Sequence, residues 1–206
     1  ISTGITMAFL CEAFERGYLS ADDTGGLDLT WGNAPDLTRL LHQIAGGVGF
    51  GRVAGRGIRH LKGWIAEEHS RRTGESAVAV REILDCFGME CKGMEFSVYV
   101  TKESLAQQGG YGFALKGAQH DEAWLIAVDQ IKGEMPTFEE KARALRWFPL
   151  FRTWFNIVGL CKLPWIDVRH PEAAKTPEPA KNLPSIEYYL EMVNSTLGTQ
   201  KTLEDL

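Results

Sequence analysis

Apolar residues recur every three to four positions along most of the chain, which is the spacing that places them on one face of a helix. Ile5, Phe9 and Ala13 share such a face near the start, and Gly17 ends this first run. The same pattern predicts helices over residues 4–18, 33–46, 53–74, 76–86, 120–132, 138–147, 149–162 and from 186 onward. The polar end of the 53–74 helix is expected to face solvent.

Local signals mark several of these helix ends. Asn33 followed by Pro35 is typical of a helix start, and Gly46–Gly47 of a helix end. Thr137 and Glu140 have the spacing of a capping box, and Ser185 is expected to cap the last helix.

The periodic pattern fails between residues 87 and 119, where glycine is dense. Irregular backbone of this length inside a domain is usually functional or disordered, so no regular element is expected there. Strand signals are few and no sequence repeat occurs. The fold class is therefore predicted to be mostly α.

The composition of the chain limits the classes of binding partner and the cellular compartment that are expected. A net charge of -5 and a pI near 5.6 argue against nucleic acid and membrane surfaces, which attract basic proteins. No apolar run is long enough to span a membrane, and no secretory signal precedes the first helix. Four cysteines without such a signal indicate free or metal-bound thiols in a reducing compartment, the cytoplasm. Ile1 in place of methionine suggests a piece of a longer protein.

Several motifs favour a plain structural explanation. The stretch "GGVGFGRVAGRG" at 46–57 is similar to a phosphate loop but follows a helix, so a helix-to-helix turn is preferred. Cys86 and Cys91 lack a metal-binding spacing, and with Cys11 they are expected to be buried structural thiols. Surface imidazoles account for the other four histidines: His42, His60, His69 and His170.

His120 ends the glycine-rich stretch "GGYGFALKGAQH" at a predicted helix start and is followed by two acidic residues. An imidazole there suits proton transfer near neutral pH. From the residues alone, a helix-start histidine with no catalytic task is the stronger reading.

The stretch "NIVGLCK" joins an amide (Asn156), a glycine that lets backbone approach a ligand (Gly159) and a thiol (Cys161) within about two helical turns. By itself this spacing is weak, because a buried cysteine in an aromatic core is the default interpretation.

Taken together, several stretches resemble the tungsten-containing aldehyde:ferredoxin oxidoreductases. They are "ISTG" at the start, "DDTGGLDLTWGN", "GFGRVAGRGIRH", "CKGMEF", "KGAQH" and "NIVGLCK". The resemblance implies the C-terminal helical domains of that family. Residues 1–88 would end the middle helical domain, and 89–206 would form a C-terminal helical domain that is incomplete at its end. The cofactors implied are a tungsten bis-pterin and a 4Fe–4S cluster.

The resemblance also implies roles for individual residues. "KGAQH" is similar to the family's "RGACH", whose histidine exchanges a proton beside the metal, and this role passes to His120. "NIVGLCK" is similar to the second pterin motif, DxxGLC. There Cys161 would be a cluster ligand and Asn156 would replace the pterin-contacting aspartate, keeping a donor and an acceptor but losing a charge. Gly159, Leu160 and Lys162 would complete this cofactor-binding motif.

The activity implied is oxidation of an aldehyde with ferredoxin, or another electron-transfer subunit, as electron partner, in a possible homo- or hetero-oligomer. Molybdenum is an alternative to tungsten. The other cluster cysteines are expected upstream, so the isolated fragment is expected to be inactive, and residues 109–117 are expected to shape a pocket. Two alternatives stay open: the tungsten subunit of a benzoyl-coenzyme A type ring reductase, acting on an aryl-coenzyme A, and a cofactor-free helical interaction module.

Overall fold

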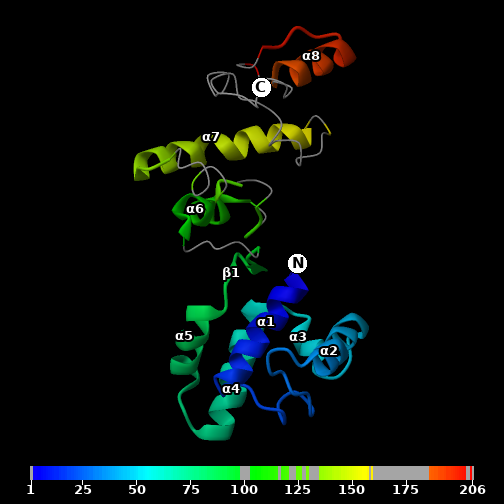
Figure 1. Cartoon of the computed structure of the whole chain (residues 1–206), viewed down its shortest axis with the longest axis vertical. Coiled ribbons are helices and arrows are strands. Elements are labelled where there is room, and N and C mark those ends of the chain that lie inside the picture. The colour runs from blue at the N-terminus through cyan, green and yellow to red at the C-terminus, as the bar shows by residue number, and fades with distance from the viewer. Residues whose placement is uncertain are drawn as a thin grey trace.

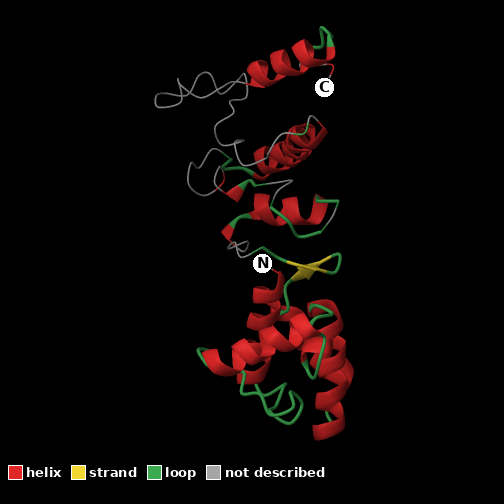
Figure 2. Ribbon diagram, turned by 90° about the vertical axis from the view of Figure 1, so that its right-hand side faces the viewer, coloured by secondary structure: helices red, strands yellow, loops and turns green. Residues whose placement is uncertain are grey.

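The computed structural model describes residues 2–97, 103–115, 117–120, 124–126, 129, 135–157, 159, 186–202 and 205. Within this part the helices are α1 (Ser2–Glu15), α2 (Ala34–Gly46), α3 (Gly51–Ala54), α4 (Ile58–Thr73), α5 (Ala77–Phe87), α6 (Leu105–Phe113), α7 (Phe138–Ile157) and α8 (Ile186–Leu197). One antiparallel hairpin pairs β1 (Glu90–Cys91) with β2 (Met94–Glu95). The prediction of a mostly α fold is confirmed, as Figure 2 shows.

The elements follow one another along the long axis of the molecule (Figure 1). Helices α1 to α5 gather at one end, the hairpin comes next, then α6 and α7, and α8 lies at the far end. Helix α4 packs on α5 and α6 packs on α7, while β2 contacts both α1 and α4. The rings of Phe155 in α7 and Tyr189 in α8 lie 5.9 Å apart.

In the part of the chain that the structure describes, two apolar clusters of buried residues stabilise the fold. The first draws on α1 to α5 and the loop after α1, and its fully buried aliphatic residues are Leu10, Leu27, Leu29, Leu40, Ile58, Leu61, Ile65, Val80 and Leu84. Burying each such side chain contributes about 1.5–3 kcal/mol. The second cluster is smaller and consists of Ala106, Leu125, Met135 and Phe148. The predicted domain boundary at 88/89 lies between the two clusters in the sequence, but the domain assignment itself stays a prediction.

The locally encoded helix ends are confirmed. The Asn33 side chain accepts a hydrogen bond from Asp36 N, and Gly47 closes α2 in the left-handed conformation at φ 62°. At the start of α7, Glu140 N donates to Thr137 Oγ1 over 3.2 Å. Thr137 N donates to Glu140 Oε2 over 2.9 Å, which completes the capping box.

Two predicted helix boundaries are wrong. A single helix was expected over 53–74, but α3 ends at Ala54 and α4 begins at Ile58, because Gly57 between them adopts φ 84°. Such a φ cannot continue a right-handed helix. Conversely, α7 runs as one helix through Pro149, where two helices were predicted. Proline removes one hydrogen bond there, and burial of the adjacent Phe148 in the second cluster favours the unbroken helix.

The stretch 87–119 is not irregular throughout, contrary to prediction. It holds the hairpin, whose Lys92–Gly93 turn has φ 56° and 84°, and the helix α6. Two positive φ values fit a two-residue hairpin turn. Ser104 caps the N-terminus of α6, and its side chain accepts from Gln107 N. Most of the helix predicted over 120–132, the predicted cap Ser185 and His170 fall outside the described residues.

Burial corrects three further predictions. His69 is 7% exposed, so it is not a surface imidazole, and the end of its helix is not fully solvated. Its Nε2 lies 3.1 Å from Glu75 Oε2, which explains how a polar ring is tolerated there. Cys86 is exposed and Cys91 is half-buried, whereas Cys11 is buried as expected.

Of the described helices, none combines the length and apolar composition needed to cross a membrane.

Candidate functional site

His120 lies where the segment after the hairpin meets the loop after α6. Ser97 N donates to Ala118 O over 3.3 Å, which places residues 97 and 118 side by side. Ser97 Oγ lies 3.1 Å from His120 Nδ1 and 3.5 Å from Ala118 O. Ser97 is only 7% exposed, so the imidazole is anchored to a buried hydroxyl.

Gly117 explains how this loop reaches the hairpin. It has φ 111°, and a Cβ added there would lie 2.8 Å from Met94 Cβ. Only glycine therefore allows the backbone before Ala118 to lie this close to β2. The glycine of "KGAQH" thus has a packing reason that is independent of any catalytic role.

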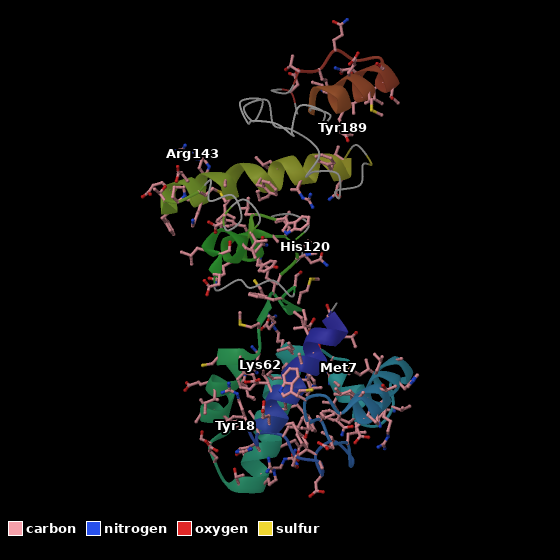
Figure 3. The ribbon with its side chains drawn as sticks, in the orientation of Figure 1. Met7, Tyr18, Lys62, His120, Arg143 and Tyr189 are labelled. Carbon is pink, nitrogen blue, oxygen red and sulfur yellow. The ribbon has the colours of Figure 1, made fainter. Side chains whose placement is uncertain are left out.

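An aromatic ring lies on another side of the imidazole. The rings of His120 and Trp124 are 5.8 Å apart at 64°, an edge-to-face arrangement. His120 is half-buried, and Figure 3 labels it between α7 and the end of the molecule formed by α1 to α5. Neither Ser97 nor Trp124 was singled out from the sequence, since no spacing rule links them to His120.

The other predicted site residues come from the end of α7. Asn156 is exposed, and its carbonyl oxygen accepts from Gly159 N over 3.2 Å. Gly159 has φ 73°, the conformation common where a helix ends. Leu160, Cys161 and Lys162 lie outside the described residues, so their predicted roles stay predictions.

Among the described residues, no side chains are grouped as a metal site, and the hydrogen bonds of the Cys86 and Cys91 thiols go to backbone carbonyls. In the ranges that the structure describes, no group of three or more His, Cys, Asp or Glu side chains could hold a metal ion. Cys91 Sγ contacts Tyr111 O at 3.6 Å, and Cys86 Sγ contacts Glu82 O at 3.4 Å. These two thiols therefore make local contacts to backbone.

A small cavity opens at the start of α1, in the "ISTG" segment. It measures about 100 Å³ and is lined by Ser2, Thr3, Thr6, Ile44, Ala54, Gly55, Gly57 and Glu95. Thr6 is 4% exposed and Glu95 is 8% exposed. Glu95 Oε1 accepts from Ile58 N over 2.9 Å at the N-terminus of α4. Three residues with hydroxyl groups and one glutamate thus line the same cavity. From the sequence, "ISTG" and "CKGMEF" were two separate motifs, and nothing predicted that they share a cavity.

A larger, apolar groove of about 720 Å³ lies between α6 and α7. Gly109, Phe113 and Leu115 line it, and these residues belong to the segment expected to shape a pocket. A Cβ on Gly109 would lie 2.4 Å from Leu145 Cδ1, so this glycine sets how closely the two helices approach. His120 is not among the residues that line this groove.

Comparison with known proteins assigns the chain to a family. The family model for aldehyde ferredoxin oxidoreductase, domains 2 and 3, matches residues 1–206. An "aliphatic sulfonate oxidoreductase, WOR-like subunit" from Pyrococcus furiosus is 25% identical over 180 residues, which cover 78% of this chain and 27% of the relative. The chain thus spans about a quarter of the length of that relative. Because the family match extends from the first residue to the last, the chain belongs to the aldehyde ferredoxin oxidoreductase family and corresponds to its domains 2 and 3.

Proposed function

We propose that this chain is the C-terminal helical portion of an oxidoreductase that converts aldehydes to carboxylic acids with a tungsten, or molybdenum, bis-pterin and a 4Fe–4S cluster. The observation that carries the proposal is the family match over all 206 residues. The resemblance of "KGAQH" to the family's histidine motif supports a catalytic role for His120. Ferredoxin, or another electron-transfer subunit, would take the electrons, and such an enzyme works in the cytoplasm.

His120 supplies the proton chemistry in this proposal. Conversion of an aldehyde and water to a carboxylic acid releases two electrons and two protons. Imidazole exchanges protons near neutral pH, so His120 takes up a proton as the acid forms. The hydrogen bond to Ser97 and the ring of Trp124 hold the imidazole in one orientation while it does so.

The described residues fit the pterin better than the cluster. Pterins are recognised through hydrogen bonds, and the cavity of Ser2, Thr3, Thr6 and Glu95 offers hydroxyl and carboxylate oxygens for one polar edge. We assign Asn156, Gly159, Leu160 and Lys162 to the second pterin contact. When bound, the metal–pterin group supplies the two-electron chemistry and the cluster passes single electrons.

The cluster does not fit the described cysteines. A 4Fe–4S cluster is usually held by a full set of cysteine thiolates, and the described part of the chain has no group of three metal-binding side chains. We assign Cys161 as one ligand and propose that the others come from outside these 206 residues.

Substitution in the intact enzyme tests the proposal. His120→Asn should lower turnover by about 10²–10⁴-fold, the usual contribution of a positioned acid–base group, with tungsten and iron content unchanged. Cys161→Ser is the matched comparison and should instead reduce iron content and the visible absorption of the cluster. Full turnover in the His120 variant would remove this residue from the mechanism, and native protein without tungsten or iron would favour the cofactor-free interaction module.

An aliphatic sulfonate is a second candidate substrate class. It is favoured by the name of the Pyrococcus furiosus relative, although only about a quarter of that relative is matched. Reduction of a viologen dye by the native enzyme, measured with aldehydes and with sulfonates separately, decides between the two classes.

A further inference from the structure

In the part of the chain that the structure describes, Lys92 is the only residue other than glycine with a positive φ, at 56°. It forms the two-residue turn of the hairpin together with Gly93, between the paired residues Cys91 and Met94. Asn followed by Gly is the preferred sequence for such a turn, because asparagine tolerates a left-handed backbone better than a long side chain does. A residue held in a costly conformation often has a functional side chain.

The side chain of Lys92 reaches the end of α6. Its ammonium donates to Gly112 O and to Ala114 O, both at 2.8 Å. Ala114 caps α6, and a cation close to the last carbonyls of a helix complements the helix dipole. Ala114 O also accepts from Gly117 N over 3.3 Å, so the same oxygen belongs to the turn that leads toward His120. Lys92 thus binds the end of the helix and the start of this loop together.

The hairpin and the residues after it hold the same loop at two further points. A Cβ added to Gly117 would lie 2.8 Å from Met94 Cβ, so the loop backbone lies directly against the hairpin. Ser97 N donates to Ala118 O over 3.3 Å, two residues before His120. Of these three contacts, the one at the end of α6 depends on a charged side chain that can be replaced without changing the path of the backbone.

We propose that Lys92 is a positioning residue for the reaction, because its ammonium fixes the loop that carries His120. The strained turn is retained because this contact requires a lysine at that place. The inference rests on the proposed function for the role of His120, but not for the contact itself. Without the ammonium the loop samples more conformations, so the imidazole is correctly placed in a smaller fraction of the molecules.

Amide exchange in the intact enzyme tests the contact. Lys92→Asn removes the ammonium and leaves Asn–Gly, so the hairpin turn is kept. Exchange at Gly117 and Gln119, whose N–H groups bond within the loop, should rise about 10-fold. Exchange at Phe96, whose N–H donates to Met89 O across the hairpin, should not change. Lys92→Arg, which keeps a cation, should behave as the native enzyme does. Unchanged exchange at Gly117, or equal acceleration at Phe96, overturns the proposal.

Turnover tests whether Lys92 acts through His120. Lys92→Asn should lower kcat about 10-fold, less than loss of the imidazole itself, and Lys92→Arg should restore it. In a His120→Asn background, Lys92→Asn should not reduce the residual turnover further, because a residue that only positions another has no effect once that one is gone. An additive loss in the double variant would overturn the positioning role.

Arg52→Asn is the matched control, because Arg52 Nε likewise donates to a carbonyl at a helix end, Gly47 O at 3.1 Å, after α2. It should leave kcat and the exchange at Gly117 unchanged. If His120→Asn keeps full turnover while Lys92→Asn still accelerates exchange, the proposed role of His120 fails, and Lys92 anchors the loop without a part in the reaction.

Discussion

Asp129 shows how a single buried charge is accommodated in this molecule. Its side chain is 6% exposed, and it accepts hydrogen bonds from Lys141 Nζ at 2.6 Å, Ser104 Oγ at 2.7 Å and Ala106 N at 3.4 Å. Burial by itself would raise the pKa of this carboxyl, but the bonds from Lys141 and Ser104 outweigh it, so the pKa lies below its ordinary value. The ionised form of Asp129 therefore stabilises the contact between α6 and α7.

Asp129→Asn should destabilise the fold by about 3 kcal/mol near neutral pH, since it leaves the Lys141 ammonium without its carboxylate partner, although Met135 O still accepts from it. The folded pKa of Asp129 is lower than the unfolded one, so its contribution is complete above about pH 4 and is lost as pH falls through the folded pKa. The difference between native and variant, measured by urea unfolding, should therefore shrink in acid. Asp22→Asn, at an exposed carboxyl, is the control and should change stability by under about 0.5 kcal/mol. An equal difference at every pH would contradict this account.

At the scale of elements, the hairpin contacts the ends of two helices with charges of the appropriate sign. Glu95 accepts from Ile58 N at the N-terminus of α4. Lys92 Nζ donates to Gly112 O and Ala114 O, both at 2.8 Å, at the C-terminus of α6. A carboxylate at a helix N-terminus and an ammonium at a C-terminus both complement the helix dipole. A hairpin with two residues in each strand thus joins the first group of helices to α6.

Gly57, just before α4, tests this contact. It adopts φ 84° and ψ 169°, a conformation that is essentially confined to glycine, and an added Cβ would lie 2.6 Å from Glu95 Oε1. Gly74, just after α4, adopts φ 80° and ψ 0°, and an added Cβ would meet no atom within 4 Å. Gly74→Ala should cost about 1–2 kcal/mol from the left-handed backbone. Gly57→Ala should cost more, because alanine rarely adopts its backbone conformation and because Glu95 must also give up its bond to Ile58 N, a loss of about 1 kcal/mol.

Thermal unfolding of both variants measures this difference in stability. In a Glu95→Ala background the cost of Gly57→Ala should fall by about 1 kcal/mol, because the carboxylate is no longer there to be displaced, whereas the cost of Gly74→Ala should stay the same. An unchanged cost of Gly57→Ala in that background would mean that the contact with Glu95 does not contribute to it.

At the scale of the whole molecule, a substitution that weakens one of the two apolar clusters is expected to leave the stability of the other unchanged. The first uses residues between Ile5 and Phe87, and the second uses residues between Ala106 and Phe148. The hairpin lies between them along the long axis (Figure 1). Among the described residues, the Asp129 carboxylate bonds to Lys141, Ser104 and Ala106, which lie on the side of the second cluster.

Hydrogen exchange tests this independence. Asp129→Asn should accelerate amide exchange in α6 and α7 by about two orders of magnitude, as expected for a loss of about 3 kcal/mol. Exchange in α4 and α5 should be unchanged. Uniform acceleration in all four helices would mean that the molecule opens as one unit and would argue against a domain boundary at 88/89.

The sequence by itself determined the helical class, most helix ranges and the ends at Asn33, Gly47 and Thr137–Glu140. These features depend on residues within one or two helical turns of each other, so local spacing was sufficient. The family motif "KGAQH" also identifies His120 as a candidate site residue.

Contacts between residues that are distant in the sequence follow only from the tertiary structure. Ser97 and His120 are 23 residues apart, and Glu95 and Ile58 are 37 apart, so no local pattern predicts either contact. The same is true of the burial of Lys62 and His69, and of the continuation of α7 through Pro149. Each depends on packing between segments that are distant in the sequence, and such packing can outweigh local preferences worth about 1–3 kcal/mol.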